Sequence, residues 1–162
     1  MDRPGFVACL GSVFEHSPWI AERAWTARPF MTVDGLHAGM MQAVLKATDE
    51  ERLALIRAHP ELAGLEASEG ALTADSSTEQ GRLGFTSLSR EEFDKVADIN
   101  RRYRERFGFP CIVALALHAQ RSTVLSEMES RVANGRAEEI ARALQQIGHI
   151  TRARLAKLVK EG

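Results

Sequence analysis

The chain has 162 residues, of which 44% are hydrophobic and 27% are charged, so it is long enough to form one domain with a sizeable core. Its 21 basic and 22 acidic residues give a formal net charge of −1, which argues against nucleic acid or an anionic membrane surface as a partner. The longest apolar run, residues 109–117, is too short to span a bilayer, and the N-terminus lacks a signal-peptide pattern. Cys9 and Cys111 fit neither a zinc pattern nor a disulfide framework, so we expect reduced thiols in a cytoplasmic protein.

Helix start and stop signals divide the N-terminal third of the chain into short segments. Residues 6–14 are weakly helical, and Ser17 and Pro18 supply an N-cap and a first-turn proline for the next helix. Asp34 is in position to cap the helix after that, in which apolar residues recur at helical spacing. These signals predict three helices before residue 48.

His59 stands where a helix must stop. The segment Thr48–Glu51 is a capping box that opens a short helix, and Pro60 disfavours helical geometry at the residue before it. The imidazole of His59 is therefore expected at a fixed corner, where a side chain that exchanges a proton near neutral pH can be aimed. The alternative is structural, because a histidine at a helix C-terminus often only caps carbonyl groups or complements the helix dipole.

Two further capping boxes follow a glycine-containing loop at residues 60–75. Ser76–Glu79 predicts a short helix that ends near Gly84, and this pattern gives Glu79 a structural explanation. Ser89–Glu92 predicts a longer helix that Gly108 terminates. Asn100 lies in the apolar stripe of that helix, and because a buried amide must find partners, we expect it to brace a neighbouring loop.

Pro110 is predicted to begin another helix that covers residues 111–117. The free N–H groups of Cys111 to Leu115 at the start of such a helix could bind an anion or an oxyanion, and the apolar run around them would exclude water. The same residues could equally be a central core helix without a chemical role.

The remaining signals complete an all-helical pattern. A helix at about residues 122–132 is broken by Asn134 and Gly135, and residues 137–159 form a final long helix. No segment alternates with a period of two for long enough to predict a strand. We therefore predict an all-α fold, a compact single-domain bundle of about seven to nine helices.

The final helix carries two arginines that point to different faces. With 100° per residue, Arg154 falls on the same face as Ile147 and Leu158, whereas Arg152 and His149 point away from that face. A guanidinium on an apolar face needs an anionic or carbonyl partner, because it cannot be neutralised. That partner is either a protein carboxylate or a substrate.

The candidate residues favour a cofactor-free acid–base enzyme that acts on a small anion. No histidine pair has metal-ligand spacing, no Cys/His cluster is present, and phosphate-binding glycine loops and G-x-S-x-G turns are missing from the sequence. An arginine and backbone amides can stabilise developing negative charge, and a histidine can donate a proton. We therefore expect neither a metal nor another cofactor.

Several separated motifs together resemble one family, the 2-oxo-4-hydroxy-4-carboxy-5-ureidoimidazoline (OHCU) decarboxylases of uric acid degradation. The N-terminal signature of that family resembles residues 14–19, and its catalytic-histidine motif resembles residues 55–64. Its second and third active-site segments resemble residues 76–80 and residues 100–110. The resemblance extends to the end at Arg152-Ala153-Arg154-Leu155 and so covers nearly the whole chain.

The resemblance implies an all-helical, cofactor-independent enzyme that decarboxylates OHCU to (S)-allantoin and carbon dioxide. It implies that His59 is the general acid, that Glu79 orients His59 and the substrate, and that Arg154 binds the anionic substrate. The substrate-binding positions that it implies are Pro60, Ser76, Ser77, Thr78, Gln80, Cys111, Ile112, Val113, Ala114 and Leu115. It also suggests a homodimer.

Two residues depart from the family pattern. Cys111 stands where the family usually has an apolar aromatic or aliphatic residue, which could alter the pocket volume, and Arg82 is unusual and could add a salt bridge. Two other functions remain open: a helical binding module or paralogue that has lost turnover, and hydrolysis of 5-hydroxyisourate. The second is usually carried by a β-rich scaffold, which the helical pattern disfavours.

Overall fold

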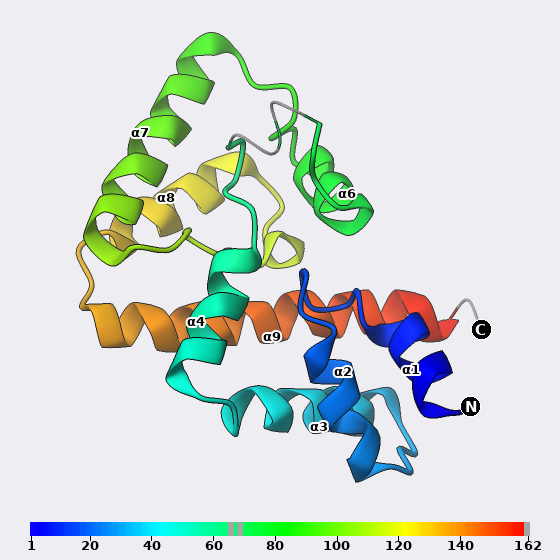
Figure 1. The fold of residues 1–162 in the computed structure, drawn as a ribbon. Helices are drawn as coiled ribbons and strands as arrows, with labels where there is room; N and C mark the ends of the chain where they lie inside the picture. Colours follow the sequence, from blue (N-terminus) through cyan, green and yellow to red (C-terminus); the bar gives the residue numbers. More distant parts are fainter. Residues whose placement is uncertain (65–66, 68–69, 161–162) are drawn as a thin grey trace. The chain divides into compact units, whose positions relative to one another are not determined.

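The computed structural model describes residues 1–64, 67 and 70–160, and within them it contains α-helices, two short 3₁₀ helices and no strand (Figure 1). The all-α prediction is therefore confirmed. Residues 65, 66, 68 and 69, which belong to the loop predicted at 60–75, lie outside the described residues. The helices are α1 (Arg3–Leu10), α2 (Trp19–Ala24), η1 (Trp25–Ala27), α3 (Val33–Leu45), α4 (Asp49–Ala58), α6 (Ala74–Arg82), α7 (Arg90–Phe107), η2 (Leu115–Leu117), α8 (Arg121–Arg131) and α9 (Arg136–Lys160).

The chain divides into two compact units, and α9 contributes to both. Unit 1 comprises residues 1–58 and 148–162, and unit 2 comprises residues 59–147. The organisation as one domain stays a prediction. None of the described helices is long and apolar enough to cross a membrane.

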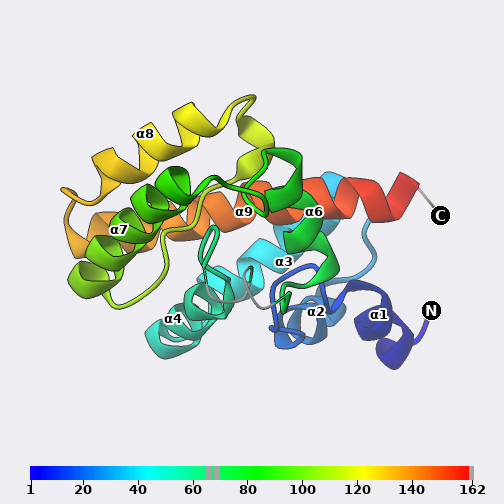
Figure 2. The same cartoon turned by 90° about the horizontal axis from the view of Figure 1, so that it is seen from above.

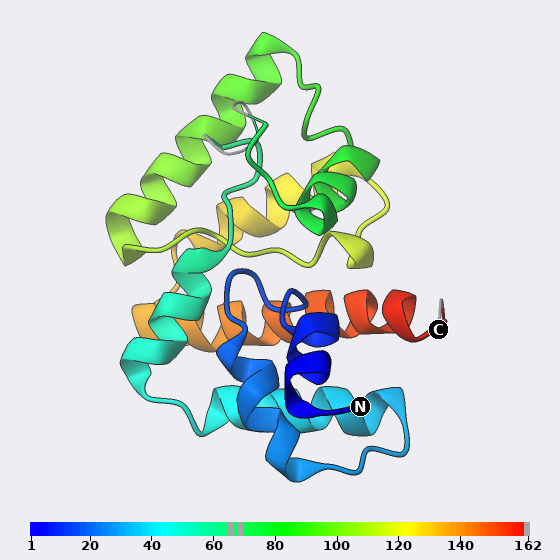
Figure 3. The same cartoon turned by 45° about the vertical axis from the view of Figure 1, so that its right-hand side comes forward.

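Unit 1 is built from α1 to α4 and the C-terminal half of α9. Within it, α2 packs against both α1 and α3 (Figure 3). The helix α1 starts earlier than predicted because the Asp2 side chain accepts a hydrogen bond from the Gly5 N–H at 2.9 Å. The buried apolar side chains of this unit include Phe14, Ile20, Met40, Val44, Leu55, Ile56 and Leu155.

Unit 2 is built from α6, α7, η2, α8 and the first half of α9, and α7 contacts α8 within it (Figure 2). Three aromatic rings pack in its core: the ring centroid of Phe107 lies 4.6 Å from that of Tyr103 and 5.9 Å from that of Phe109. The other large buried apolar side chains include Phe85, Ile99, Met128 and Ile147.

Local signals located several helix ends correctly. The Thr48 hydroxyl accepts from the Glu51 N–H and the Glu51 carboxylate accepts from the Thr48 N–H, each at 3.1 Å, so α4 begins with the predicted box. Ser89 caps α7 in the same way, through the Glu92 N–H at 3.2 Å. Gly108 ends α7 in the left-handed conformation, with φ of 78°.

Three predicted caps are wrong, because another residue occupies the cap position. Ser17 makes no cap for α2, since its hydroxyl donates instead to the Glu15 carbonyl at 2.8 Å. Thr32, rather than Asp34, caps α3 through the Gly35 N–H at 2.9 Å. Thr73 likewise caps α6, which therefore begins before the box predicted at residues 76–79.

The helix predicted to start at Pro110 is absent from the described structure. Residues 110–114 have no regular secondary structure, and only Leu115–Leu117 form a 3₁₀ turn. The segment is nevertheless core, since Phe109 and residues 111–115 are all buried. An apolar run of this length does not distinguish helix from extended backbone, and its β-branched Ile112 and Val113 favour the extended form.

Candidate active site

His59 lies at the exit of α4, as predicted, because α4 ends at Ala58 and Pro60 follows. The His59 side chain is buried, with 6% of its surface exposed. A proton donor removed from bulk water acts on a bound substrate rather than on solvent. The position therefore suits an acid–base role.

The loop that follows His59 is fixed by side chains from α6 and α7. The Gln80 side-chain oxygen accepts from the Ala63 N–H at 3.0 Å, and its amide group donates to the Glu61 carbonyl at 3.4 Å. The Asn100 amide donates to the Leu62 carbonyl at 2.8 Å. The prediction that Asn100 braces a neighbouring loop is thus confirmed.

Ala63 shows how firmly this loop is held. Its φ of 48° lies in the left-handed region, which costs an L-amino acid about 1–2 kcal/mol. Such a conformation persists where the surroundings determine it, and here the hydrogen bond from the Ala63 N–H to Gln80 and the burial of Ala63 do so. The backbone at Ala63 is therefore held in place by α6.

The predicted site residues 76–80 lie on two different faces of α6. Ser76 and Gln80, four residues apart, are buried on one face, whereas Ser77 and Thr78 are exposed. Glu79 is half-buried. Because α6 starts at Ala74, Glu79 lies beyond the first turn, so the capping-box explanation for it is wrong.

The segment 111–115 carries buried backbone donors. The Ala114 N–H donates to the Gln146 side-chain oxygen at 2.9 Å, so this amide is already used by the protein. Within the described part of the chain, the other four N–H groups of the segment donate to no protein acceptor. Buried N–H groups of this kind are rare and call for a partner. An anionic ligand oxygen would provide one, even though the segment is not a helix start.

Arg82 connects α6 to this segment. Its guanidinium donates to the carbonyl of Leu115, and to the carbonyl of His118 at 2.8 Å. The expected salt bridge is therefore replaced by backbone hydrogen bonds. Since Gln80 holds the loop after His59 and Arg82 holds Leu115, unit 2 brings three of the predicted site segments together around α6.

Arg154 belongs to unit 1, where it is buried as its helical phase predicted. Its guanidinium donates to the Val13 carbonyl at 3.1 Å and pairs with the Glu15 carboxylate at 3.0 Å. A protein carboxylate is thus one partner of Arg154. Arg152 forms a more exposed pair with Asp34 at 2.7 Å.

Sequence reasoning missed two charged residues with structural roles. Glu15 gave no local signal, because its pairing with Arg154 spans 139 positions. Arg131 had a readable signal: it follows the buried Val124 and Met128 at helical spacing on α8. The phase argument that found Arg154 would also have found Arg131.

Cys111 is a buried free thiol. Burial raises the pKa of the Cys111 thiol to about 12, whereas Cys9 is exposed.

Among the described residues, no three His, Cys, Asp or Glu side chains gather closely enough to hold a metal ion.

Alkylation should separate the two cysteines. We expect iodoacetamide at pH 8 to label Cys9 of the folded protein and to leave Cys111 unlabelled, because about one thiol in 10⁴ is ionised four pH units below its pKa. Intact-mass measurement of the folded and the denatured protein checks this. A Cys9→Ser variant is the control, and rapid labelling of its folded form would contradict the prediction.

Comparison with known proteins identifies relatives along the whole chain. The OHCU decarboxylase family model matches residues 1–156. An OHCU decarboxylase of Haloferax volcanii is 40% identical over 157 residues, which cover 97% of this chain and 90% of the relative. The uric acid degradation bifunctional protein PucL of Bacillus subtilis is 35% identical over 161 residues, or 99% of this chain and 32% of PucL. A crystal structure of (S)-allantoin synthase matches with a TM-score of 0.77 and 27% identity over 98% of this chain and 51% of that one.

These matches define an all-helical carboxy-lyase. More narrowly, the chain belongs to the OHCU decarboxylase family, and its reaction is a step of uric acid degradation. The resemblance of the separated motifs is therefore confirmed, and OHCU is the substrate that the family indicates.

Proposed function

We propose that this chain converts OHCU to (S)-allantoin and carbon dioxide with His59 as the general acid, Glu79 as the residue that orients it, and Arg154 as an anion-binding residue. The observation that carries the proposal is the set of four buried N–H groups, from residues 111–113 and 115, in the same unit as a buried histidine. Such donors stabilise an oxyanion strongly, because they are fixed and shielded from water.

The chemistry requires charge stabilisation followed by one proton transfer. When the carboxylate leaves as carbon dioxide, the electron pair of the broken C–C bond moves into the ring and spreads over the neighbouring ureido-bearing carbon and its ring nitrogen. The amides of residues 111–113 and 115 stabilise that charge. His59 then delivers a proton to the ureido-bearing carbon from one side, and the hydroxyl group on the carbon that lost carbon dioxide gives up its proton to become the carbonyl of allantoin. Delivery to a single face of the planar intermediate produces one enantiomer, and the neutral imidazole regains its proton from water.

The other assigned residues support this sequence of events. Ser76 and Gln80 lie on the buried face of α6 and Pro60 fixes the corner beside His59, so we assign these residues to the wall of the substrate pocket. Glu79 lies on α6 beyond its first turn, between the buried Ser76 and Gln80, and we assign its carboxylate to orienting the imidazole. Arg154, oriented by Glu15, carries a planar guanidinium, a group that suits recognition of a carboxylate.

We further propose that the protein is a cytoplasmic homodimer. Two free cysteines, Cys9 and Cys111, suit a reducing compartment, and the family resemblance suggests the dimer. Light scattering after size-exclusion chromatography would report a mass near 36 kDa for two chains of 17.9 kDa. A mass of about 18 kDa at micromolar concentration would refute the dimer.

The activity is tested with freshly generated OHCU, which also decays slowly without an enzyme. We expect the protein to accelerate carbon dioxide release and to produce optically active allantoin, measured by circular dichroism. Equal rates with and without protein, or a racemic product, would refute the assignment. Stoichiometric binding without carbon dioxide release would instead identify a binding protein.

A further inference from the structure

Unit 2 contains a buried charged cluster that the proposed mechanism does not use. The side chains of Arg131 on α8 and Glu139 on α9 are 1% and 0% exposed, and the Arg131 Nε lies 2.8 Å from Glu139 Oε1. The same carboxylate accepts from the Tyr103 hydroxyl at 2.6 Å and from the Asn134 amide at 2.9 Å. Glu139 is thus held by three donors, and it fixes the Arg131 guanidinium in one orientation.

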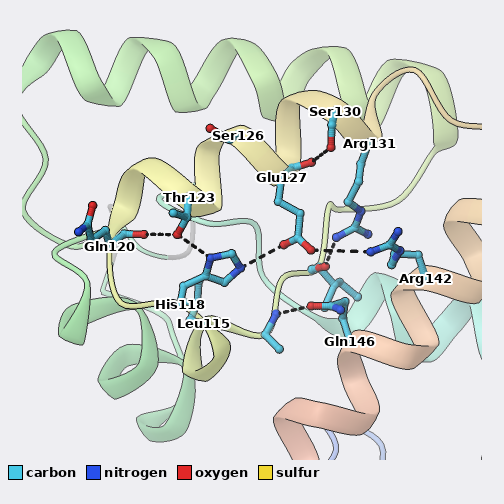
Figure 4. A network of polar contacts seen from close by, with 12 residues as sticks. Leu115, His118, Gln120, Thr123, Ser126, Glu127, Ser130, Arg131, Arg142 and Gln146 are labelled. Atoms are coloured by element: carbon cyan, nitrogen blue, oxygen red, sulfur yellow. Dashed lines mark hydrogen bonds and ion pairs between the residues drawn. The ribbon is translucent and has the colours of Figure 1, made fainter.

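The fixed guanidinium reaches the segment 111–115. The Arg131 Nη1 donates to the Ile112 carbonyl at 2.6 Å, while the Gln146 side-chain oxygen accepts from the Ala114 N–H at 2.9 Å. Figure 4 shows Arg131 and Gln146, from α8 and α9, reaching the same stretch of backbone. The non-helical segment is therefore anchored by side chains from neighbouring helices.

Peptide geometry gives this anchoring a direction. The carbonyl of Ile112 and the N–H of Val113 belong to one planar trans peptide unit, so they point in opposite directions. When Arg131 holds the Ile112 carbonyl, it also aims the Val113 N–H away from itself. Among the described residues, that N–H donates to no protein acceptor.

We propose that Arg131, anchored by Glu139, is a positioning residue that aims the Val113 N–H at the negative charge that develops in the reaction. The inference rests on the proposed function, in which residues 111–115 stabilise that charge. Oxyanion donors work because their direction is fixed before the reaction begins. A loosened peptide unit at residues 112–113 would reorient at a cost in kcat, while the contacts that bind the substrate elsewhere would keep KM nearly unchanged.

The test uses a double variant that leaves no lone buried charge. Arg131→Met with Glu139→Gln removes both charges and the donor to Ile112, and such neutral replacements are often tolerated in a core. We expect kcat to fall about 10-fold to 100-fold, with KM within about threefold of the wild type. Hydrogen exchange measured by mass spectrometry should be at least about tenfold faster in residues 111–115, with α7 as the internal reference.

A matched control pair lies on the surface of the same unit. Arg102 and Glu129 form a two-point ion pair at 2.8 and 2.7 Å between α7 and α8, with both side chains partly exposed. Arg102→Met with Glu129→Gln should leave kcat and the exchange of residues 111–115 unchanged. If the double core variant fails to fold, Arg131→Lys should show an intermediate loss of kcat, because it keeps a cation but replaces two separate, rigidly held donor nitrogens by one.

The outcomes separate the inference from the proposed function. A folded core variant with wild-type kcat, or with wild-type exchange in residues 111–115, would overturn the positioning role. Wild-type kcat in a folded Arg131→Lys variant would overturn it as well. An inactive wild-type protein would refute the proposed function and the catalytic part of the inference, and the exchange data would still decide whether Arg131 holds the segment.

Discussion

His59→Ala is expected to lower kcat by about 10²–10⁴-fold, the range typical for loss of a general acid. The imidazole is the proposed source of the proton that completes allantoin, and His59 is buried at a corner fixed by Pro60. Initial rates with fresh OHCU, corrected for its spontaneous decay, provide the measurement.

The stereochemistry of the residual product gives a second readout for the same variant. Water protonates the intermediate from either face, so the allantoin formed by His59→Ala should lose most of its optical activity. His149→Ala, which changes an exposed histidine, is the control and should retain both rate and enantiomer. A His59→Ala variant within threefold of the wild-type rate would show that another group donates the proton.

Arg154→Ala is expected to lower the free energy of unfolding by about 3–5 kcal/mol, because it removes the guanidinium from the buried Glu15 carboxylate. Arg152→Ala removes a more exposed ion pair with Asp34 and should cost about 0.2–1 kcal/mol. Urea unfolding of both variants measures the difference. Activity should follow the same order, and the reverse order would contradict the assignment of Arg154.

A paired substitution distinguishes a role in binding from a role in folding. Arg154→Met with Glu15→Gln removes both charges, so much of the stability lost in Arg154→Ala should return. The activity should not return if Arg154 binds the substrate. Recovery of both stability and activity would assign Arg154 to folding alone.

Helix ends were predictable where one residue dominated the local signal. Thr48 and Ser89 had a box partner three residues on, and Gly108 could adopt the left-handed conformation without strain. The predictions failed at Asp34 and at Ser76, where an earlier threonine took the cap position. Competing caps a few residues apart have similar energies, so tertiary packing decides between them.

For the segment after Pro110, burial could be predicted from the sequence, but its hydrogen-bond partners could not. Its apolar character correctly predicted burial, but the hydrogen-bond partners of its backbone come from Arg82, Arg131 and Gln146, far away in the sequence. A sequence without the fold does not reveal such partners. The bracing role of Asn100 was predictable, because a buried amide needs a partner. Its particular acceptor, the carbonyl of Leu62, was not.

The discontinuity of unit 1 bears on the order in which the protein folds. Residues 59–147 are contiguous, whereas unit 1 joins residues 1–58 to residues 148–162. In unit 1, Glu15 meets its partner Arg154 across 139 positions of the sequence. Contacts of such large sequence separation form slowly. We therefore expect the ion pair between Glu15 and Arg154 to form late in folding.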